Sequence, residues 1–576
     1  MKLSKAVLLA NQAKQPAADR RPVALVCGFS PLHLETFLAA HLRERFPESS
    51  IPIRVGVFGD VTGNLERLAG SDAPSAVVLE WQDLDPRLGA RSAGGWKASS
   101  IASILSEVPQ ALARLLAALQ KAAAHNTVVL APPSLPLPPL GHTSLAQASP
   151  VELQLEDHLS AFVRKAAEIA GVRVVSRQRL DQLSPLAQRY DVKLDLAAGF
   201  PYRAEHVDIL CSLLAPLLFP PVPKKGLITD LDDTLWKGIL GEIGADQVVW
   251  DLASHAQPHG LYQQTLAALA DQGVLVGCAS KNERSEVDKA FSRPDLLLPA
   301  ASVFPIEAHW SAKSESIGRI LKAWNILPSS VVFVDDSPIE LAEVQSRYPE
   351  ITCLLFPRND AEGVWNLLAQ LKDFFGKPVV VEEDLIRAAS LRNASTWAPE
   401  ETGSAASSAF LEQIEAVVTI DTRKDPSDPR PLELVNKTNQ FNLNGRRYTE
   451  SEWRTLLEDP HSFVWTVSYT DKFGPLGKIA VLAGRRAQPA PEVGAWVMSC
   501  RAFSRRIEHH VLDRLYAELD AANIRLDYRA TEKNKPLQEF LTALVPGIDG
   551  SQAPVLEASE FSSRQPGLPH RVVIQK

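Results

Sequence analysis

The chain contains 576 residues, too many for one hydrophobic core, and this length predicts two to four domains. A formal net charge of −8 excludes nucleic acid as the main partner, because that partner requires a basic face. The five scattered cysteines, with no C-x-x-C pair, favour a reducing cytoplasm over a structural zinc site, and no apolar run approaches the ~20 residues that span a bilayer.

The first part of the chain alternates buried strands with amphipathic helices. This alternation predicts a parallel α/β sheet. The expected strands are PVALVCGF (22–29), SAVVLEW (75–81), NTVVLAPP (126–133) and GVRVVS (171–176), and the expected helices are LHLETFLAAHLRERF (32–46) and LEDHLSAFVRKAAEIA (155–170).

Ser30 follows the first of these strands and allows two interpretations. A serine esterase would use Ser30 as nucleophile and His206 as base, but the usual GDS signature is absent. A simpler interpretation makes Ser30 the cap of the helix that starts at PLHLETFL. We therefore expect a non-catalytic domain used for docking or scaffolding.

Changes in composition predict the domain boundaries. LFPPVPKKG (218–226) is rich in proline, and WAPEETGSAASSAF (397–410) is small and polar. We expect domains at 1–222, 223–385 and 386–576. The last combines strands at 463–471, 478–485 and 493–500 with a helix whose apolar stripe contains Ile507, Val511, Leu515 and Leu519.

Three apolar strands in the central region each run into polar residues. LITDLDDT (227–234) ends on carboxylates, VLVGCASKN (274–282) ends on Ser280 and Asn282, and SVVFVDDSP (330–338) ends on Asp335 and Asp336. Continuous apolar runs suit strands buried on both faces of a parallel sheet, whose carboxyl ends meet at one ligand-binding edge. Lys313 begins the helix after HWSA and reaches the same edge.

Carboxylates gathered at one edge repel each other unless a cation joins them. Oxygen ligands of this kind suit Mg²⁺, which in turn attracts a phosphate. Ser280 and Lys313 would then bind the phosphate, so the set predicts a phosphoryl-transfer site in which one aspartate is the nucleophile. A single D-x-D-x-T motif is more often an Asp-rich turn. Here that motif occurs in order with the Ser280 cluster, Lys313 and the Asp335-Asp336 pair, and this combination argues against a simple turn.

These clusters resemble the four motifs of the haloacid dehalogenase (HAD) phosphatases. The resemblance implies that Asp230 attacks phosphorus and that Asp232 acts as general acid and then base. It also implies that Asp230, the Asp232 carbonyl and Asp336 hold Mg²⁺ with support from Asp335. The short interval between Thr234 and Ser280 leaves no room for a cap domain, and Asp233 is expected to be a solvated neighbour.

Within the HAD superfamily, DLDDTLWKGILGEIGAD, CASKNE, HWSAKSESI and VFVDDSPIE resemble the FkbH-like proteins of subfamily IIIC. VNKTNQFNLNGRRYT (435–449) and VMSCRAFSRRIEHHVL (497–512) resemble the later segments of that family, so the resemblance covers about residues 225–545. It implies an SGNH-hydrolase-like first domain and a GNAT-like α+β last domain. It also implies that Thr234, Trp236 and Asn282 lie beside the substrate.

The family resemblance implies dephosphorylation of 1,3-bisphosphoglycerate and loading of its glyceryl group onto an acyl carrier protein, in polyketide-type biosynthesis. Two residues depart from the pattern: Leu235 stands where some glyceryl-loading members carry cysteine, and Lys237 replaces a small residue. Dephosphorylation is therefore better supported than acyl transfer. The alternatives are a plain phosphatase acting on a sugar phosphate or other small metabolite, and a non-catalytic assembly protein.

The segment NKTNQFN is unusually rich in amides. One interpretation is that its side chains bind substrate or a pantetheine arm. The alternative is that they form a hydrogen-bonded turn. These residues are Asn436, Lys437, Asn439, Gln440 and Asn442. The expected cofactor is Mg²⁺. The expected partners are a small phosphorylated substrate and an acyl carrier protein, with no nucleic acid and no membrane.

Overall fold

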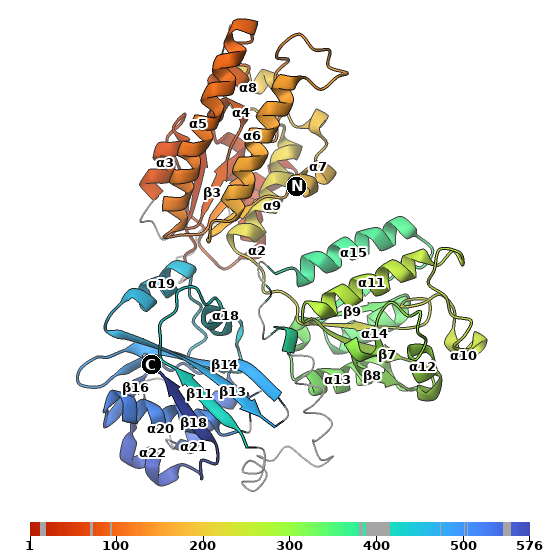
Figure 1. Ribbon diagram of the computed structural model, residues 1–576, viewed down its shortest axis with the longest axis vertical. Helices are drawn as coiled ribbons and strands as arrows, with labels where there is room; N and C mark the ends of the chain where they lie inside the picture. The colour runs from red at the N-terminus through yellow and green to blue at the C-terminus, as the bar shows by residue number, and fades with distance from the viewer. Residues whose placement is uncertain are drawn as a thin grey trace. The chain divides into compact units, whose positions relative to one another are not determined.

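The computed structural model (Figure 1) describes residues 1–11, 19–68, 73–92, 95–377, 380, 384–386, 415–472, 474–499, 502–503, 505–544 and 554–576. The chain divides into two compact units, Met1–Pro221 with Thr449–Glu452, and Val222–Tyr448 with Trp453–Lys576. The division after Pro221 falls inside the proline-rich stretch that predicts a boundary. The predicted boundary at 385/386 adjoins a stretch outside the described residues.

The first unit is a parallel sheet covered by helices. Its strands lie in the order β2-β1-β3-β4-β5, and every pairing is parallel. The strands are β1 (Val23–Cys27), β2 (Ile53–Val55), β3 (Ser75–Val78), β4 (Val128–Ala131) and β5 (Val172–Val174). The helices are α1 (Leu3–Asn11), α2 (Leu32–Arg45), α3 (Val61–Leu68), α4 (Trp81–Leu84), α5 (Ala98–Ala123), α6 (Pro150–Ala167), α7 (Arg177–Leu183), α8 (Val192–Ala198) and α9 (Ala204–Leu218).

Helix α5 is the one described helix that is long and apolar enough to cross a membrane by length and composition. It packs against α3 and α6. Its buried face includes Ile104, Val108, Leu112, Leu115 and Leu119, which belong to a core cluster shared with β3 and β4. The helix therefore serves as a core element of this α/β unit.

Ser30 does not cap α2, contrary to our interpretation of the sequence. The N-cap position is Pro31, no side chain caps this end of the helix, and the Ser30 amide donates to the Gly199 carbonyl. His206 bonds other serines, with Nε2 3.1 Å from Ser134 Oγ and Nδ1 2.9 Å from Ser184 Oγ. All three side chains are buried, so the arrangement stabilises the core and leaves no serine nucleophile accessible there.

The central region contains a second parallel sheet, in the order β10-β9-β6-β7-β8. Its strands are β6 (Gly226–Thr229), β7 (Leu275–Ser280), β8 (Val303–Ala308), β9 (Val331–Asp335) and β10 (Thr352–Leu355). Its helices are α10 (Leu240–Ile243), α11 (Gln257–Asp271), α12 (Arg284–Phe291), α13 (Lys313–Trp324), α14 (Pro338–Arg347) and α15 (Ala361–Phe375).

The central strands are apolar throughout because both of their faces are covered. Leu227, Val276 and Val332 pack on the face of α11 and α15, which lie side by side (Figure 1). Ile228 and Phe333 pack on the opposite face with α13 and α14. Successive strand residues point to opposite faces, so continuous apolar runs were the correct signal for this sheet.

The C-terminal part is built on a mixed sheet in the order β17-β16-β15-β14-β13-β11-β18, with β12 paired to β15. Its strands are β11 (Val417–Asp421), β12 (Phe441–Asn442), β13 (Ser462–Asp471), β14 (Gly474–Arg485), β15 (Glu492–Met498), β16 (Asn523–Leu526), β17 (Val555–Glu557) and β18 (Arg571–Gln575). Its helices are α18 (Arg430–Lys437), α19 (Glu450–Glu458), α20 (Ile507–Leu519), α21 (Lys535–Leu544) and α22 (Ala558–Arg564). The predicted stripe of α20 packs into the core.

Close packing of α13 on the sheet depends on a glycine in β7. A Cβ on Gly277 would lie 2.8 Å from Cζ2 of Trp324, which is fully buried and donates through Nε1 to the Phe304 carbonyl at 2.7 Å. We predict that Gly277→Ala lowers the free energy of unfolding by roughly 1–3 kcal/mol, because the indole must move in a packed core.

The matched control for this substitution is Gly241→Ala in α10. A Cβ on Gly241 would meet only Asn282 Oδ1, at 3.8 Å. Chemical denaturation should therefore show little change or slight stabilisation for this variant, since alanine favours a helix. Equal stabilities for the two variants would contradict the proposed role of the indole contact.

Candidate active site

The predicted site residues meet at the carboxyl edge of the central sheet, where its strand order reverses. Asp230 directly follows β6, Asp335 ends the neighbouring strand β9, and Ser280 ends β7 on the other side of β6. Lys313 is the first residue of α13. Open α/β sheets bind ligands at such reversal points because the crossover helices diverge there.

Three carboxylates at this edge form a group of metal-ligand type. Asp230, Asp335 and Asp336 each offer an oxygen within 4.8 Å of the others. Thr234 is fully buried and fixes Asp336, since its hydroxyl accepts a bond from the Asp336 amide at 3.1 Å. Hard oxygen ligands in this number suit Mg²⁺, which completes its octahedron with water and substrate.

Lys313 lies between two of these carboxylates. Its ammonium is 2.8 Å from Asp230 Oδ1 and 2.5 Å from Asp335 Oδ2, and all three side chains are buried. Burial alone would lower the pKa of Lys313, but the two carboxylates outweigh it and raise the pKa above its usual value. The lysine is therefore a fixed positive charge beneath the site.

One ammonium cannot neutralise all the acids around it. Burial raises the pKa of Asp230 to about 7, and the Asp335 charge adds to this effect while Lys313 opposes it. Burial also raises the pKa of Asp336, again with a contribution from Asp335. The metal-free site thus holds excess negative charge and takes up a proton near neutral pH.

Asp232 stands apart from the carboxylate group and is held by three donors. Trp236 Nε1 and the Leu240 amide donate to Oδ1, each at 3.1 Å, and Asn282 Nδ2 donates to Oδ2 at 2.9 Å. Asn282 also donates to Ser280 Oγ at 3.0 Å. These bonds fix the orientation of a half-buried carboxylate beside the three-carboxylate group.

Some residues that were predicted to contact substrate instead hold the carboxylates of the site in place. The Trp236 and Thr234 side chains are fully buried, so the structure gives them contacts with Asp232 and Asp336 where the sequence predicted contacts with substrate. Leu235 is also fully buried, in the hydrophobic core between the sheet and α11. A side chain at that position has no access to an acyl group in this conformation.

No domain is inserted between β6 and β7. This stretch, which is fully described, contains only two helices, α10 and α11. It agrees with the short interval seen in the sequence.

Arg358 was missed by sequence reasoning. Its Nη1 donates to Asp233 Oδ2 at 3.0 Å and to Asp336 Oδ2 at 3.1 Å, and half of the side chain is exposed. Asp233 Oδ1 also accepts from the Gly238 amide at 2.9 Å. Asp233 therefore anchors a turn and an arginine, where we expected a solvated neighbour. Arg358 lies just after β10, at the same sheet edge as the carboxylates. This position is the feature of the sequence that could have indicated its role.

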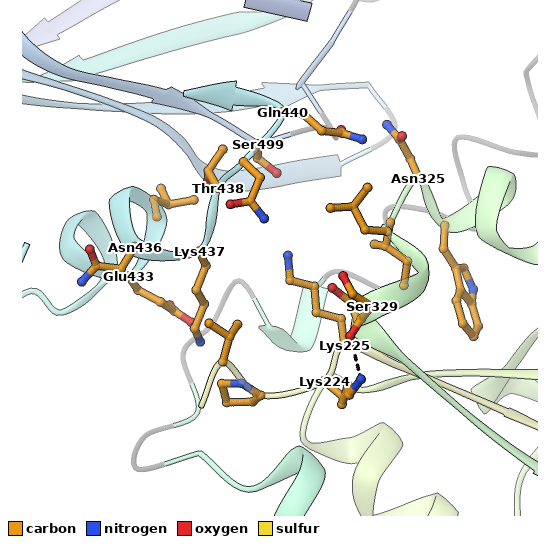
Figure 2. Close-up of a pocket in the computed structure, with 18 of the residues that line it drawn as sticks. Lys224, Lys225, Asn325, Ser329, Glu433, Asn436, Lys437, Thr438, Gln440 and Ser499 are labelled. Atoms are coloured by element: carbon orange, nitrogen blue, oxygen red, sulfur yellow. Dashed lines mark hydrogen bonds and ion pairs between the residues drawn. The ribbon is translucent and has the colours of Figure 1, made fainter. Parts of the chain in front are cut away.

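Most of the amide-rich segment lines a separate cavity of about 380 Å³, shown in Figure 2. The other walls include Lys224, Lys225 and Ser330, which precede β6 and β9. These lie at the amino ends of strands whose carboxyl ends carry Asp230 and Asp335. The segment members that line the cavity are Asn436, Lys437, Thr438, Asn439 and Gln440.

Two amides of this segment, Asn436 and Asn442, are engaged by backbone groups. Asn436 exchanges two bonds of 2.8 Å with the Tyr448 backbone and points away from the centre of the cavity in Figure 2. Asn442, outside the cavity lining, donates to the Thr438 carbonyl at 3.0 Å and accepts from the Gly445 amide at 2.8 Å. A role in binding substrate or a pantetheine arm stays a prediction.

No protein-family model and no curated protein matches the chain. A solved structure is similar: the N-terminal part of the protein BF1531 from Bacteroides fragilis, containing a phosphatase domain complexed with Mg. The two are 16% identical with a TM-score of 0.51, over 66% of this chain and all of that one. At this identity the similarity shows an α/β fold alone.

A second solved structure is a GCN5-related glucosamine N-acetyltransferase region of a fungal multi-domain GH3 β-N-acetylglucosaminidase. It covers 89% of this chain and 61% of that one at 10% identity, with a TM-score of 0.16. A similarity this low supports no argument about the C-terminal part.

Removal of the Lys313 charge should destabilise the metal-free protein. We predict that Lys313→Met costs about 3–5 kcal/mol, because two buried carboxylates lose their partner, and that Mg²⁺ restores part of the loss. The control is Lys281→Met, which removes a half-exposed ion pair with Glu340 at 2.6 Å and should cost under about 1 kcal/mol. Urea denaturation of both variants, with and without Mg²⁺, measures the difference.

Affinity for Mg²⁺ should fall as the pH falls through neutrality. Below about pH 7 the metal-free site holds a proton on Asp230 that the ion must displace, so the Kd rises by up to about tenfold per pH unit. Mg²⁺ titrations between pH 8 and pH 6, followed by tryptophan fluorescence, test this expectation. A Kd that is constant over this range would show that Asp230 is already ionised without metal.

Proposed function

We propose that the protein is a Mg²⁺-dependent phosphatase of the HAD type. The single observation that supports this most strongly is the buried group of Asp230, Asp335 and Asp336 around the Lys313 ammonium, with the oriented Asp232 beside it. An ordinary salt-bridge network needs neither the surplus of negative charge nor the position at the sheet reversal. A phosphoryl-transfer site needs both.

In this proposal, Asp230, Asp336 and the Asp232 carbonyl would hold Mg²⁺, which would supply positive charge to balance that of the phosphoryl group. An oxygen of Asp230 attacks phosphorus, and the bond from phosphorus to the leaving oxygen breaks. Asp232 donates its proton to that oxygen and then accepts one from the water that hydrolyses the aspartyl phosphate. Ser280 and Lys313 bind the phosphoryl oxygens.

We further propose that the substrate is a small acyl phosphate such as 1,3-bisphosphoglycerate, whose acyl group passes to an acyl carrier protein in the cytoplasm. The support is the likeness of the central and C-terminal segments to FkbH-like proteins, together with the lack of an inserted domain between β6 and β7. The SGNH-like and GNAT-like assignments of the flanking domains belong to the same proposal.

One observation favours the plain phosphatase as a second candidate. Leu235 occupies the position where a loading enzyme would carry a thiol, and it is buried in the core. Cys278, in β7, is fully buried, and burial raises the pKa of its thiol well above the usual value. Neither Leu235 nor Cys278 therefore offers an accessible thiol for an acyl-enzyme intermediate.

Intact-protein mass spectrometry distinguishes these candidates. The wild-type protein, Mg²⁺, 1,3-bisphosphoglycerate and a phosphopantetheinylated carrier protein are incubated, with Asp230→Asn as the matched inactive variant. We expect phosphate release and a glyceryl adduct on the carrier, both absent with Asp230→Asn. Phosphate release without adduct would establish the plain phosphatase, and phosphate release that survives Asp230→Asn would contradict the site.

A further inference from the structure

The first unit contains a cavity of about 230 Å³ at the carboxyl edge of its own sheet. Its walls come from residues that follow β3 and β4 and from the stretch that contains α8. Its lining includes Glu80, Trp81, Trp96, Leu135, Tyr190 and Asp195. This is the edge at which parallel α/β sheets bind ligands, and the phosphatase proposal does not use it.

The walls of this cavity are aromatic and apolar. The indole nitrogens of Trp81 and Trp96 donate to the carbonyls of Leu135 and Arg87, at 3.1 and 2.9 Å, so these side chains offer only ring surface to a ligand. Trp96 is 42% exposed and marks the side that solvent reaches. Four prolines, Pro136, Pro138, Pro139 and Pro201, add to the apolar lining.

Two carboxylates belong to the lining, and one of them is saturated. Glu80 accepts bonds from the Ser134 amide and hydroxyl, the Leu135 amide and the Tyr202 hydroxyl, at 2.7–3.2 Å. These four donors fix the loop after β4 against β3. Glu80 therefore has no capacity left for a ligand.

Asp195 is the unsaturated carboxylate. Only 1% of the residue is exposed, and its Oδ2 accepts from the Tyr190 hydroxyl at 2.8 Å, but its Oδ1 is buried with no hydrogen-bond partner among the described residues. Leaving such an oxygen without a donor costs about 1–3 kcal/mol or more, which a ligand donor would recover.

The charges around the cavity favour a cation. No lysine or arginine occurs among the described residues that line it. Arg91, nearby, donates through Nη1 to the backbone carbonyl of Asp195 at 2.7 Å. A carboxylate oxygen beside tryptophan and tyrosine rings is the combination that recognises ammonium groups, through a charged hydrogen bond and cation–π contacts.

We propose that this cavity binds a small organic ammonium ion, whose N–H donates to Asp195 Oδ1 while its apolar body packs between Trp81, Trp96 and Tyr190. The small volume limits the ligand to a metabolite-sized amine. The first unit is then a ligand-binding domain, independent of the phosphatase chemistry. A bound ammonium ion would supply the hydrogen-bond donor that Asp195 Oδ1 lacks in the fold.

The test uses the full-length protein and benzylammonium as the probe, with benzyl alcohol as its neutral counterpart of the same shape. We expect saturable binding of benzylammonium by isothermal titration calorimetry, and binding at least about tenfold weaker for benzyl alcohol, because the charged hydrogen bond is lost. Asp195→Asn should weaken benzylammonium binding by a similar factor.

Asp191→Asn is the matched control. Asp191 lies in the same segment, caps α8 by accepting from the Leu194 amide at 2.9 Å, and is not part of the cavity lining. Asparagine keeps that cap and removes the same charge, so this variant should bind benzylammonium as the wild type does. If Asp195→Asn fails to fold, Trp96→Ala, at the exposed rim, serves in its place with a several-fold expected loss.

Four results would overturn the proposal. Two concern the wild type: no saturable binding of benzylammonium, or equally tight binding of benzyl alcohol. The third is unchanged binding by a folded Asp195→Asn variant, and the fourth is an equal loss of binding in Asp191→Asn and Asp195→Asn, which would make the effect one of overall charge. None of these results bears on phosphate release by the second unit.

Discussion

The buried contact of the Lys313 ammonium with Asp230 and Asp335 is the interaction on which the central sheet depends. Charges removed from water cost several kcal/mol each unless they are paired closely. Here, one cation joins the ends of two neighbouring strands, β6 and β9, at 2.8 and 2.5 Å. The same contact brings the first residue of α13 to the sheet edge, so the site and the packing of the helix are formed together.

This contact leaves the site short of positive charge. The pKa of Asp230 rises to about 7, and that of Asp336 rises as well, chiefly because both are buried. In the proposed function, a divalent cation and a phosphate together correct this imbalance of charge. The bonds that Thr234, Trp236 and Asn282 make with Asp336 and Asp232 keep the acids in place before any ligand arrives.

The sequence predicted the central sheet well where burial was complete. β6, β7 and β9 are apolar runs that end in polar clusters, and parallel pairing brings those ends together without further information. The short edge strands β2 and β10 were missed, and none of their residues is fully buried. The long helix α5 was missed too, since serine, alanine and Pro109 weaken its pattern.

Residue identity was easier to predict than residue role. The sequence placed Trp236 beside the substrate, but only the fold shows that its ring is buried and that its N–H orients Asp232. Arg358 follows no motif, and its contact with Asp336 depends on β10 lying next to β9. Ser30 looked like a helix cap by spacing, yet the turn after β1 directs its amide to Gly199. Each of these depends on a tertiary contact that spacing along the chain does not encode.

The central claim is that Asp230 is the phosphoryl acceptor. The most direct measurement traps the intermediate in an Asp232→Asn variant, where hydrolysis is slowed, by mixing it with Mg²⁺ and acetyl phosphate, quenching with acid and reducing with borohydride. Reduction of an aspartyl phosphate yields homoserine, which peptide mass spectrometry locates. The account predicts homoserine at position 230 only when substrate and Mg²⁺ are both present. Phosphate release with homoserine at another aspartate, or at none, would contradict it.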